Sequence, residues 1–191
     1  MLKSTVVSFA GRQVMLPGVK GFNLNDHLNL NPSYFIFPAW RAFAERTHLT
    51  AWRTLQSDGQ ALLGQMGWGK SHLPSDWVAL RADGKMLPAK EWPPRMSFDA
   101  IRIPLYLSWA DPHSALLAPG RPGCRVTRAC KPRRGSTSAP TRWPRYMAGG
   151  LLAVRDLTLG EPQEAPQIDD KDDYYSASLK LLVWLAKQDQ R

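Results

Sequence analysis

Apolar residues recur at the spacing of amphipathic helices along most of this chain, and this periodicity limits its fold more than any other feature. It predicts a helix over 32–46, opened by Pro32 in its first turn, and a second that begins with Thr50 as N-cap. A last helix is predicted over 172–188. The residues expected to face a core are Phe37, Trp40, Phe43 and Ala44, then Trp52, Leu55, Leu62, Leu63 and Met66, and finally Tyr175, Leu179, Leu182 and Ala186.

Strand signals are confined to short stretches. Residues 77–88 alternate around Asp83-Gly84, which is a strong signal for a hairpin. No βαβ rhythm is present, so the pattern favours an all-α fold with small β-hairpin excursions. Gly59 is a weak point of the second helix, because glycine is a poor helix former.

The stretch 96–109 places Asp99, Arg102 and Tyr106 at i, i+3 and i+7 within an otherwise apolar run. On a helix these three side chains would share one face. The plainer interpretation is a surface ion pair of little consequence. The functional interpretation is a carboxylate that a guanidinium keeps ionised, which suits a general base that takes a proton from water.

Several motifs occur together in this chain in a fixed order. S-F-D-A-I-R surrounds Asp99, and the others are Q-V-M-L-P-G-V-K-G-F at 13–22, L-N-P-S-Y at 30–34, L-P-S-D-W-V at 73–78 and, more weakly, D-D-Y-Y-S-A-S-L at 172–179. In these motifs the chain resembles glycoside hydrolase family 8, in particular the endo-β-1,4-glucanases encoded with bacterial cellulose synthase.

The resemblance implies a fold and a chemistry. The fold would be a partial (α/α)6 toroid, and the activity inverting hydrolysis of β-1,4-glucan without metal or cofactor. Asp99 would be the general base, assisted by Arg102 and by Tyr34 near the attacking water. The side chains that would contact the glucan are Asn31, Trp77, Tyr106, Tyr174 and Tyr175.

Two motifs of the family are missing from the sequence. The general acid of the family is a Glu in an E-G-x-S-Y-G-M-like motif, and neither this motif nor a D-G-D-like motif occurs here. We therefore expect 1–117 and 149–191 to correspond to the C-terminal half of the catalytic domain, inactive alone. Half a ring would leave apolar helix faces exposed, including those of Phe37, Trp40, Phe43, Trp52, Leu55 and Leu182, and would favour self-association.

The positive charge of the chain is concentrated in one segment. Of the 25 Lys and Arg, nine lie between Pro112 and Arg155 without any acidic residue, which leaves 16 basic and 16 acidic residues elsewhere. Residues 118–148 are rich in Pro and Gly and are expected to be irregular. Three explanations remain open: a solvated linker, the product of compensating frameshifts, and a nucleic-acid-binding arm. Cys124 and Cys130 alone do not supply the four ligands of a structural zinc.

The remaining function classes are separable by simple criteria. A nucleic-acid-binding protein would carry its charge among aromatics on a folded face, so no nucleic-acid partner is expected here. A non-catalytic glucan-binding remnant would use the same aromatics without an acid. Neither a membrane span nor a signal peptide is predicted, so the chain as written is expected to be cytoplasmic, although the family is periplasmic or secreted.

Overall fold

The structure is a computed structural model that describes residues 1–68, 72–117, 148–161 and 165–190. It divides into two units, Met1–Ile103 and Pro104–Arg191. The predicted basic segment 118–148 lies outside the described residues except for its last residue. Its expected irregularity and the predicted division at residue 117 stay predictions.

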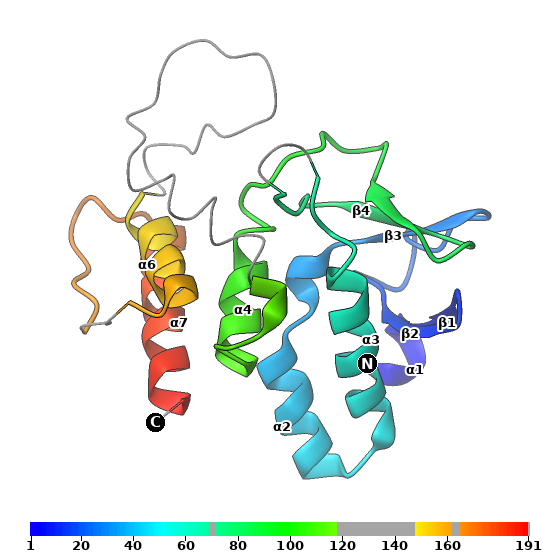
Figure 1. The fold of residues 1–191 in the computed structure, drawn as a ribbon, viewed down its shortest axis with the longest axis horizontal. Coiled ribbons are helices and arrows are strands. Elements are labelled where there is room, and N and C mark those ends of the chain that lie inside the picture. Colours follow the sequence, from blue (N-terminus) through cyan, green and yellow to red (C-terminus); the bar gives the residue numbers. More distant parts are fainter. Residues whose placement is uncertain (69–71, 118–147, 162–164, 191) are drawn as a thin grey trace. The chain divides into compact units, whose positions relative to one another are not determined.

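A pair of helices forms the core of the first unit. Helices α2 (Phe37–Thr47) and α3 (Thr50–Leu63) lie side by side in Figure 1. Phe37 and Trp40 are at most 3% exposed, and their rings meet edge to face at 5.4 Å. The predicted core residues of α3 and its C-terminal end, which are Trp52, Leu55, Leu62, Leu63 and Met66, are also buried.

The exposed apolar face expected for a half ring is not present at most of these positions. Phe37, Trp40, Trp52 and Leu55 are at most 6% exposed, so the expectation is wrong for them. Phe43 is 40% exposed, although its ring lies 4.9 Å from that of Trp52. The two helices cover each other, which is why these side chains find a core within the unit.

The beginnings of both helices differ from the prediction. Residues Pro32–Tyr34 form a separate 3-10 turn, η1, and α2 begins only at Phe37. Pro38 lies in the first turn of α2, where its missing N–H costs no intrahelical hydrogen bond. Thr50 is the first helical residue of α3, and the N-cap is Leu49 without a side-chain hydrogen bond.

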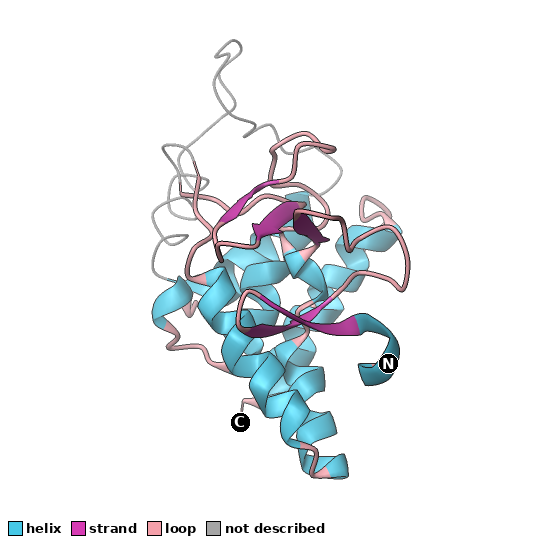
Figure 2. Cartoon of the chain, turned by 90° about the vertical axis from the view of Figure 1, so that its right-hand side faces the viewer, coloured by secondary structure: helices cyan, strands magenta, loops and turns pink. Residues whose placement is uncertain are grey.

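Two small antiparallel sheets complete the first unit (Figure 2). One follows helix α1 (Leu2–Thr5) and consists of β1 (Val6–Phe9) and β2 (Arg12–Met15). The other has the order β3 (His27–Leu30), β4 (Val78–Arg81), β5 (Met86–Pro88). The hairpin predicted around Gly84 is confirmed as β4–β5, and Gly84 has a φ of +79° that favours glycine.

The register of β3 and β4 prepares the candidate site. Leu30, the last residue of β3, pairs with Val78, the first residue of β4. Because the strands are antiparallel, the chain leaves β3 towards Asn31 at the same end of the sheet where it enters β4 from Asp76. Two motifs that are far apart in the sequence therefore meet at one end of the sheet.

Helix α4 (Arg102–Ala110) begins later than the sequence suggested. Asp99 lies in the preceding turn, whose backbone closes through the bond from Arg102 N–H to the Asp99 carbonyl at 3.0 Å. Pro104 falls in the first turn of α4, where it needs no backbone donor, and this explains the late start. The prediction that Asp99, Arg102 and Tyr106 share one helix is thus wrong for Asp99.

In the second unit, η2 (Ala115–Leu117) precedes a helix pair, α6 (Ala148–Leu159) and α7 (Tyr174–Asp189), which lie side by side in Figure 1. The predicted stripe of α7 is partly wrong. Leu179 and Ala186 are buried, but Tyr175 and Leu182 are only partly so, and Ser176 and Val183 take the buried places. The reason is the close approach of Gly150, whose N–H donates to Ser176 Oγ at 2.8 Å.

Candidate active site

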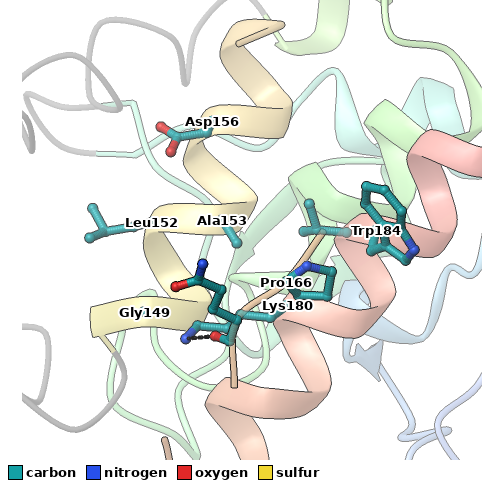
Figure 3. Close-up of a pocket in the computed structure, with 9 residues that line it drawn as sticks. Gly149, Leu152, Ala153, Asp156, Pro166, Lys180 and Trp184 are labelled. Atoms are coloured by element: carbon teal, nitrogen blue, oxygen red, sulfur yellow. Dashed lines mark hydrogen bonds between the residues drawn. The ribbon is translucent and has the colours of Figure 1, made fainter. Parts of the chain in front are cut away.

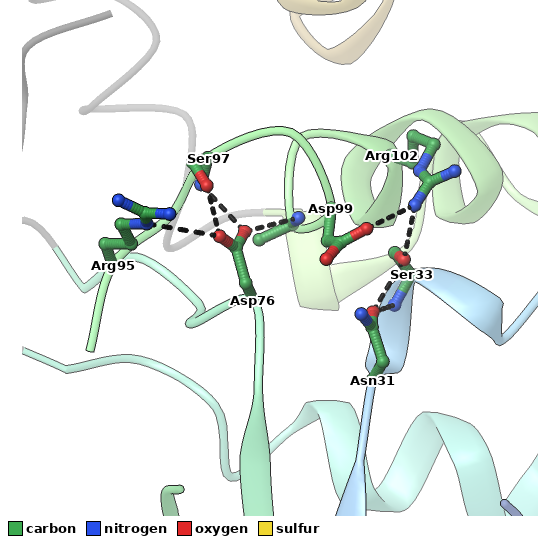
Figure 4. A network of polar contacts seen from close by, with 8 residues as sticks. Asn31, Ser33, Asp76, Arg95, Ser97, Asp99 and Arg102 are labelled. Atoms are coloured by element: carbon green, nitrogen blue, oxygen red, sulfur yellow. Dashed lines mark hydrogen bonds and ion pairs between the residues drawn. The ribbon is translucent and has the colours of Figure 1, made fainter. Parts of the chain in front are cut away.

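A chain of polar contacts joins the end of β3 to the start of α4 (Figure 4). Asn31 Oδ1 accepts from the backbone N–H of Ser33 at 3.1 Å and from Ser33 Oγ at 2.6 Å. Arg102 Nη2 donates to Ser33 Oγ at 2.9 Å and to Asp99 Oδ1 at 2.6 Å. One guanidinium nitrogen, Nη2, therefore links Ser33 to Asp99, and this link fixes the position of the Asp99 carboxylate.

Asp99 combines a charge partner with access to solvent. Its side chain is 27% exposed and that of Arg102 is 24% exposed. The Tyr34 ring, 39% exposed as a residue, lies with its centroid 5.8 Å from Arg102 Cζ. This is within the range of a cation–π contact. The structure thus brings together Asn31, Tyr34, Asp99 and Arg102 of the predicted site.

Two donor groups of this network lack a hydrogen-bond partner within the described ranges. Among the described residues, Asn31 Nδ2 and Arg102 Nε are buried without a hydrogen-bond partner. Both groups can only donate, so each lacks an acceptor. The polar network that holds Asp99 thus includes two buried donors whose acceptor is not among the described residues.

A second carboxylate organises the turn that carries Asp99. Asp76 is 5% exposed, and its Oδ1 accepts from the backbone N–H groups of Ser97 at 2.8 Å and Ala100 at 2.9 Å (Figure 4). Its Oδ2 accepts from Ser97 Oγ and lies 3.9 Å from Arg95 Nε. Sequence reasoning missed Asp76 and Ser33. The signal available was their place in the 73–78 and 30–34 motifs.

Trp77 is engaged by other rings. It stacks on Trp92 at a centroid distance of 4.3 Å and 10° between the planes, and on Phe22 at 5.9 Å and 8°. This packing competes with the predicted stacking on a sugar, which stays a prediction.

The other predicted contact residues belong to the second unit. Tyr106 is only 9% exposed, Tyr175 is partly exposed, and Tyr174 is 89% exposed at the first residue of α7. Their predicted contacts with a glucan stay predictions.

The second unit has a pocket of about 220 Å³ between α6 and α7 (Figure 3). Its cation is already engaged, because Lys180 Nζ donates to the Gln167 carbonyl at 3.0 Å and to Asp172 Oδ2 at 2.6 Å. The Lys180 bond, followed by the backbone N–H of Asp169, holds the pKa of Asp172 below its ordinary value. The pocket is smaller than ordinary ligand sites of about 300–1,000 Å³.

The described ranges show neither a metal centre nor a membrane-spanning helix. They contain no group of three His, Cys, Asp or Glu placed to hold a metal ion. None of the helices in these ranges is long and apolar enough to cross a membrane.

Comparison with known proteins decides the family. The family model of glycosyl hydrolases family 8 matches residues 1–189. The chain belongs to glycoside hydrolase family 8. This family 8 chain is 81% identical over 165 residues to an endoglucanase of Cellulomonas uda and 36% identical over 185 residues to a probable endoglucanase of Novacetimonas hansenii. The crystal structure of endoglucanase Cel10 from Klebsiella pneumoniae matches all of the chain with 83% identity and a TM-score of 0.89.

The alignments with these family 8 proteins cover a larger share of this chain than of its relatives. The aligned regions make up 86% and 93% of this chain but only 46% and 53% of the Cellulomonas and Novacetimonas proteins. The match to the Klebsiella structure covers 62% of that chain. The chain thus spans about half the length of the curated relatives it matches. The predicted fold class, a partial all-α toroid with small β excursions, is confirmed by the match to the Klebsiella structure and by the mostly helical structure.

Proposed function

We propose that Met1–Ile103 supplies the water-activating side of an inverting endo-β-1,4-glucanase. The observation that carries this proposal is the partly exposed Asp99 carboxylate, held at 2.6 Å by Arg102 Nη2. Membership of family 8 supports it, and the Cellulomonas relative is an endoglucanase.

The chemistry requires a base and an acid on opposite sides of the sugar. Asp99 would take a proton from water as the water oxygen bonds to the anomeric carbon and the glycosidic bond breaks. A carboxylic acid would protonate the leaving oxygen at the same time. The E-G-x-S-Y-G-M-like motif that carries this acid in the family does not occur in the sequence. We therefore propose that the chain alone does not turn over β-1,4-glucan.

The neighbours of Asp99 have distinct roles in this proposal. Arg102 would keep the carboxylate in place through the bond from Nη2. Tyr34, on the Arg102 guanidinium, would limit the movement of the water and present its hydroxyl to the ring that is cleaved.

A chimera tests the role of Asp99. The 165 aligned residues of the Cellulomonas uda endoglucanase would be replaced by those of this chain, and release of reducing ends from carboxymethylcellulose would be measured. We expect activity in the chimera and a loss of about 10²- to 10⁴-fold in Asp99→Asn. The control is Asp83→Asn, because this carboxylate lies on the β4–β5 turn beside Arg81 and Lys85. Full activity of the Asp99→Asn chimera would refute the assignment.

A non-catalytic glucan-binding role is the second candidate, favoured by the missing acid motif. It predicts that the chain sediments with cellulose and releases no sugar, while the chimera also remains inactive. An active chimera would decide for the enzyme.

A further inference from the structure

We propose that Asp76 is a positioning residue that holds the Asp99 carboxylate against Arg102 by fixing the turn 97–100. This inference rests on the proposed function, because it concerns the same base. It adds Asp76 to the residues of the proposed site, with a role that is exerted through the backbone of the turn 97–100.

The bonds of Asp76 bracket Asp99 in the sequence. One oxygen, Oδ1, accepts the N–H of Ser97 two residues before Asp99 and the N–H of Ala100 directly after it. The other oxygen accepts Ser97 Oγ. Since Ala100 is fully buried, its N–H has no access to water as a replacement acceptor. The backbone on both sides of Asp99 is therefore tied to one side chain.

Asp76 and Trp77 also restrain the stretch of chain that leads from β5 to this turn. Asp76 N–H donates to the Arg95 carbonyl at 2.8 Å, and Ala89 N–H donates to the Trp77 carbonyl at 3.1 Å. The rings of Trp77 and Trp92 stack between these two points. The chain from β5 to Asp99 is thus held at successive places by the residues that enter β4.

The charge of Asp76 is compensated by hydrogen bonds more than by an ion pair. Its cationic neighbour, Arg95, lies at 3.9 Å and has a side chain that is 55% exposed, so the attraction is weak. A carboxylate that is 5% exposed needs close donors to balance the loss of its hydration, and the turn supplies three. Asparagine at this position would keep the Oδ1 acceptor for both backbone N–H groups, whereas alanine would remove it.

The test compares Asp76→Ala, Asp76→Asn and the control Asp58→Ala in the full chain. Asp58 is a suitable control because it also accepts a backbone N–H, that of Gln13 at 2.8 Å, but lies on α3. The readouts are amide hydrogen exchange at Ala100 and the ¹⁵N–¹H signals of the Arg102 guanidinium. Exchange at Ala100 reports the turn 97–100, and the guanidinium signals report the bonds from Arg102 Nη2 to Asp99 and Ser33.

We expect Asp76→Ala to speed exchange at Ala100 by about 10- to 100-fold, the effect of losing a hydrogen bond to a charged acceptor, and to shift the Arg102 guanidinium signals, because Nη2 then keeps Ser33 Oγ but loses Asp99. Asp76→Asn should retain both the slow exchange and the Arg102 signals, and Asp58→Ala should leave them unchanged. Unchanged Arg102 signals in Asp76→Ala, the same shift in Asp58→Ala, or equal effects of Asp76→Ala and Asp76→Asn would each overturn the proposal.

Two safeguards keep the test decisive. If Asp76→Ala does not fold, exchange at Ala100 in the unsubstituted chain decides, since an unprotected amide there would overturn the proposal. Neither readout needs turnover. An active Asp99→Asn chimera would therefore refute Asp99 as base, while the Arg102 signals still show whether Asp76 positions it.

Discussion

Replacing Gly59 by alanine tests how tightly the aromatic core of the first unit is packed. Gly59 is buried in α3, and a Cβ atom there would lie 3.1 Å from Trp40 Cζ3 and 3.3 Å from Phe37 Cε1. Carbon atoms pack best at about 3.5–4.0 Å, so both rings would have to move by a few tenths of an ångström. Trp40 has little room, because its ring also packs against that of Phe35, with 5.5 Å between the ring centroids.

Two effects oppose each other in Gly59→Ala. Alanine stabilises a helix interior by about 1 kcal/mol over glycine. Overpacking of a well-packed core costs about 1–3 kcal/mol. We expect the packing term to prevail, because Phe37 and Trp40 are at most 3% exposed and enclosed by other rings. The free energy of unfolding should fall by about 1 kcal/mol.

Urea denaturation followed by circular dichroism measures this difference. Gly64→Ala is the matched control, since Gly64 lies exposed at the C-cap of α3 with a φ of −60° that alanine adopts readily. This control should change stability little. If Gly59→Ala instead raised the unfolding free energy by about 1 kcal/mol, the full helix-propensity gain, the core would have room for the added methyl group and the reasoning would be refuted.

Two further predictions concern stability. Because the folded-state pKa of Asp172 is lowered, chiefly by its bond from Lys180, its stabilisation is present above about pH 4 and is lost as the pH falls through that pKa. Asp172→Asn should therefore lower the free energy of unfolding, measured by urea denaturation, at pH 7 but not at about pH 2. An equal loss at both pH values would contradict this. Trp92→Ala should destabilise the chain by at least about 1 kcal/mol through loss of the stack on Trp77, and an unchanged urea midpoint would show that the stack contributes nothing.

The sequence allowed prediction where local patterns decide the structure. The hairpin at Gly84 and the buried faces of α2 and α3 follow from turn chemistry and helical period. The contact between Asp99 and Arg102 was also expected, because it spans only three residues.

What sequence reasoning missed depends on contacts between distant segments. The orientation of α7 is set by the backbone of Gly150 against Ser176, and no apolar period encodes that approach. The residues next to Asp76 in the sequence do not indicate that its carboxylate is buried. It becomes buried because the turn 97–100 folds over it, 21 to 24 residues further along the chain. Ser33 meets Arg102 across 69 residues, a contact that depends on strand pairing.

The pairing of β3 with β4 has a consequence for the order of folding. All of α2 and α3 lies between these two strands in the sequence, and the helix pair can form from local contacts. Closing the long loop between the strands costs more chain entropy, so such contacts tend to form late. Arg102 meets Ser33 only after this closure. Substitutions of Arg102 should then mainly accelerate unfolding, whereas those in the α2–α3 pair should slow folding.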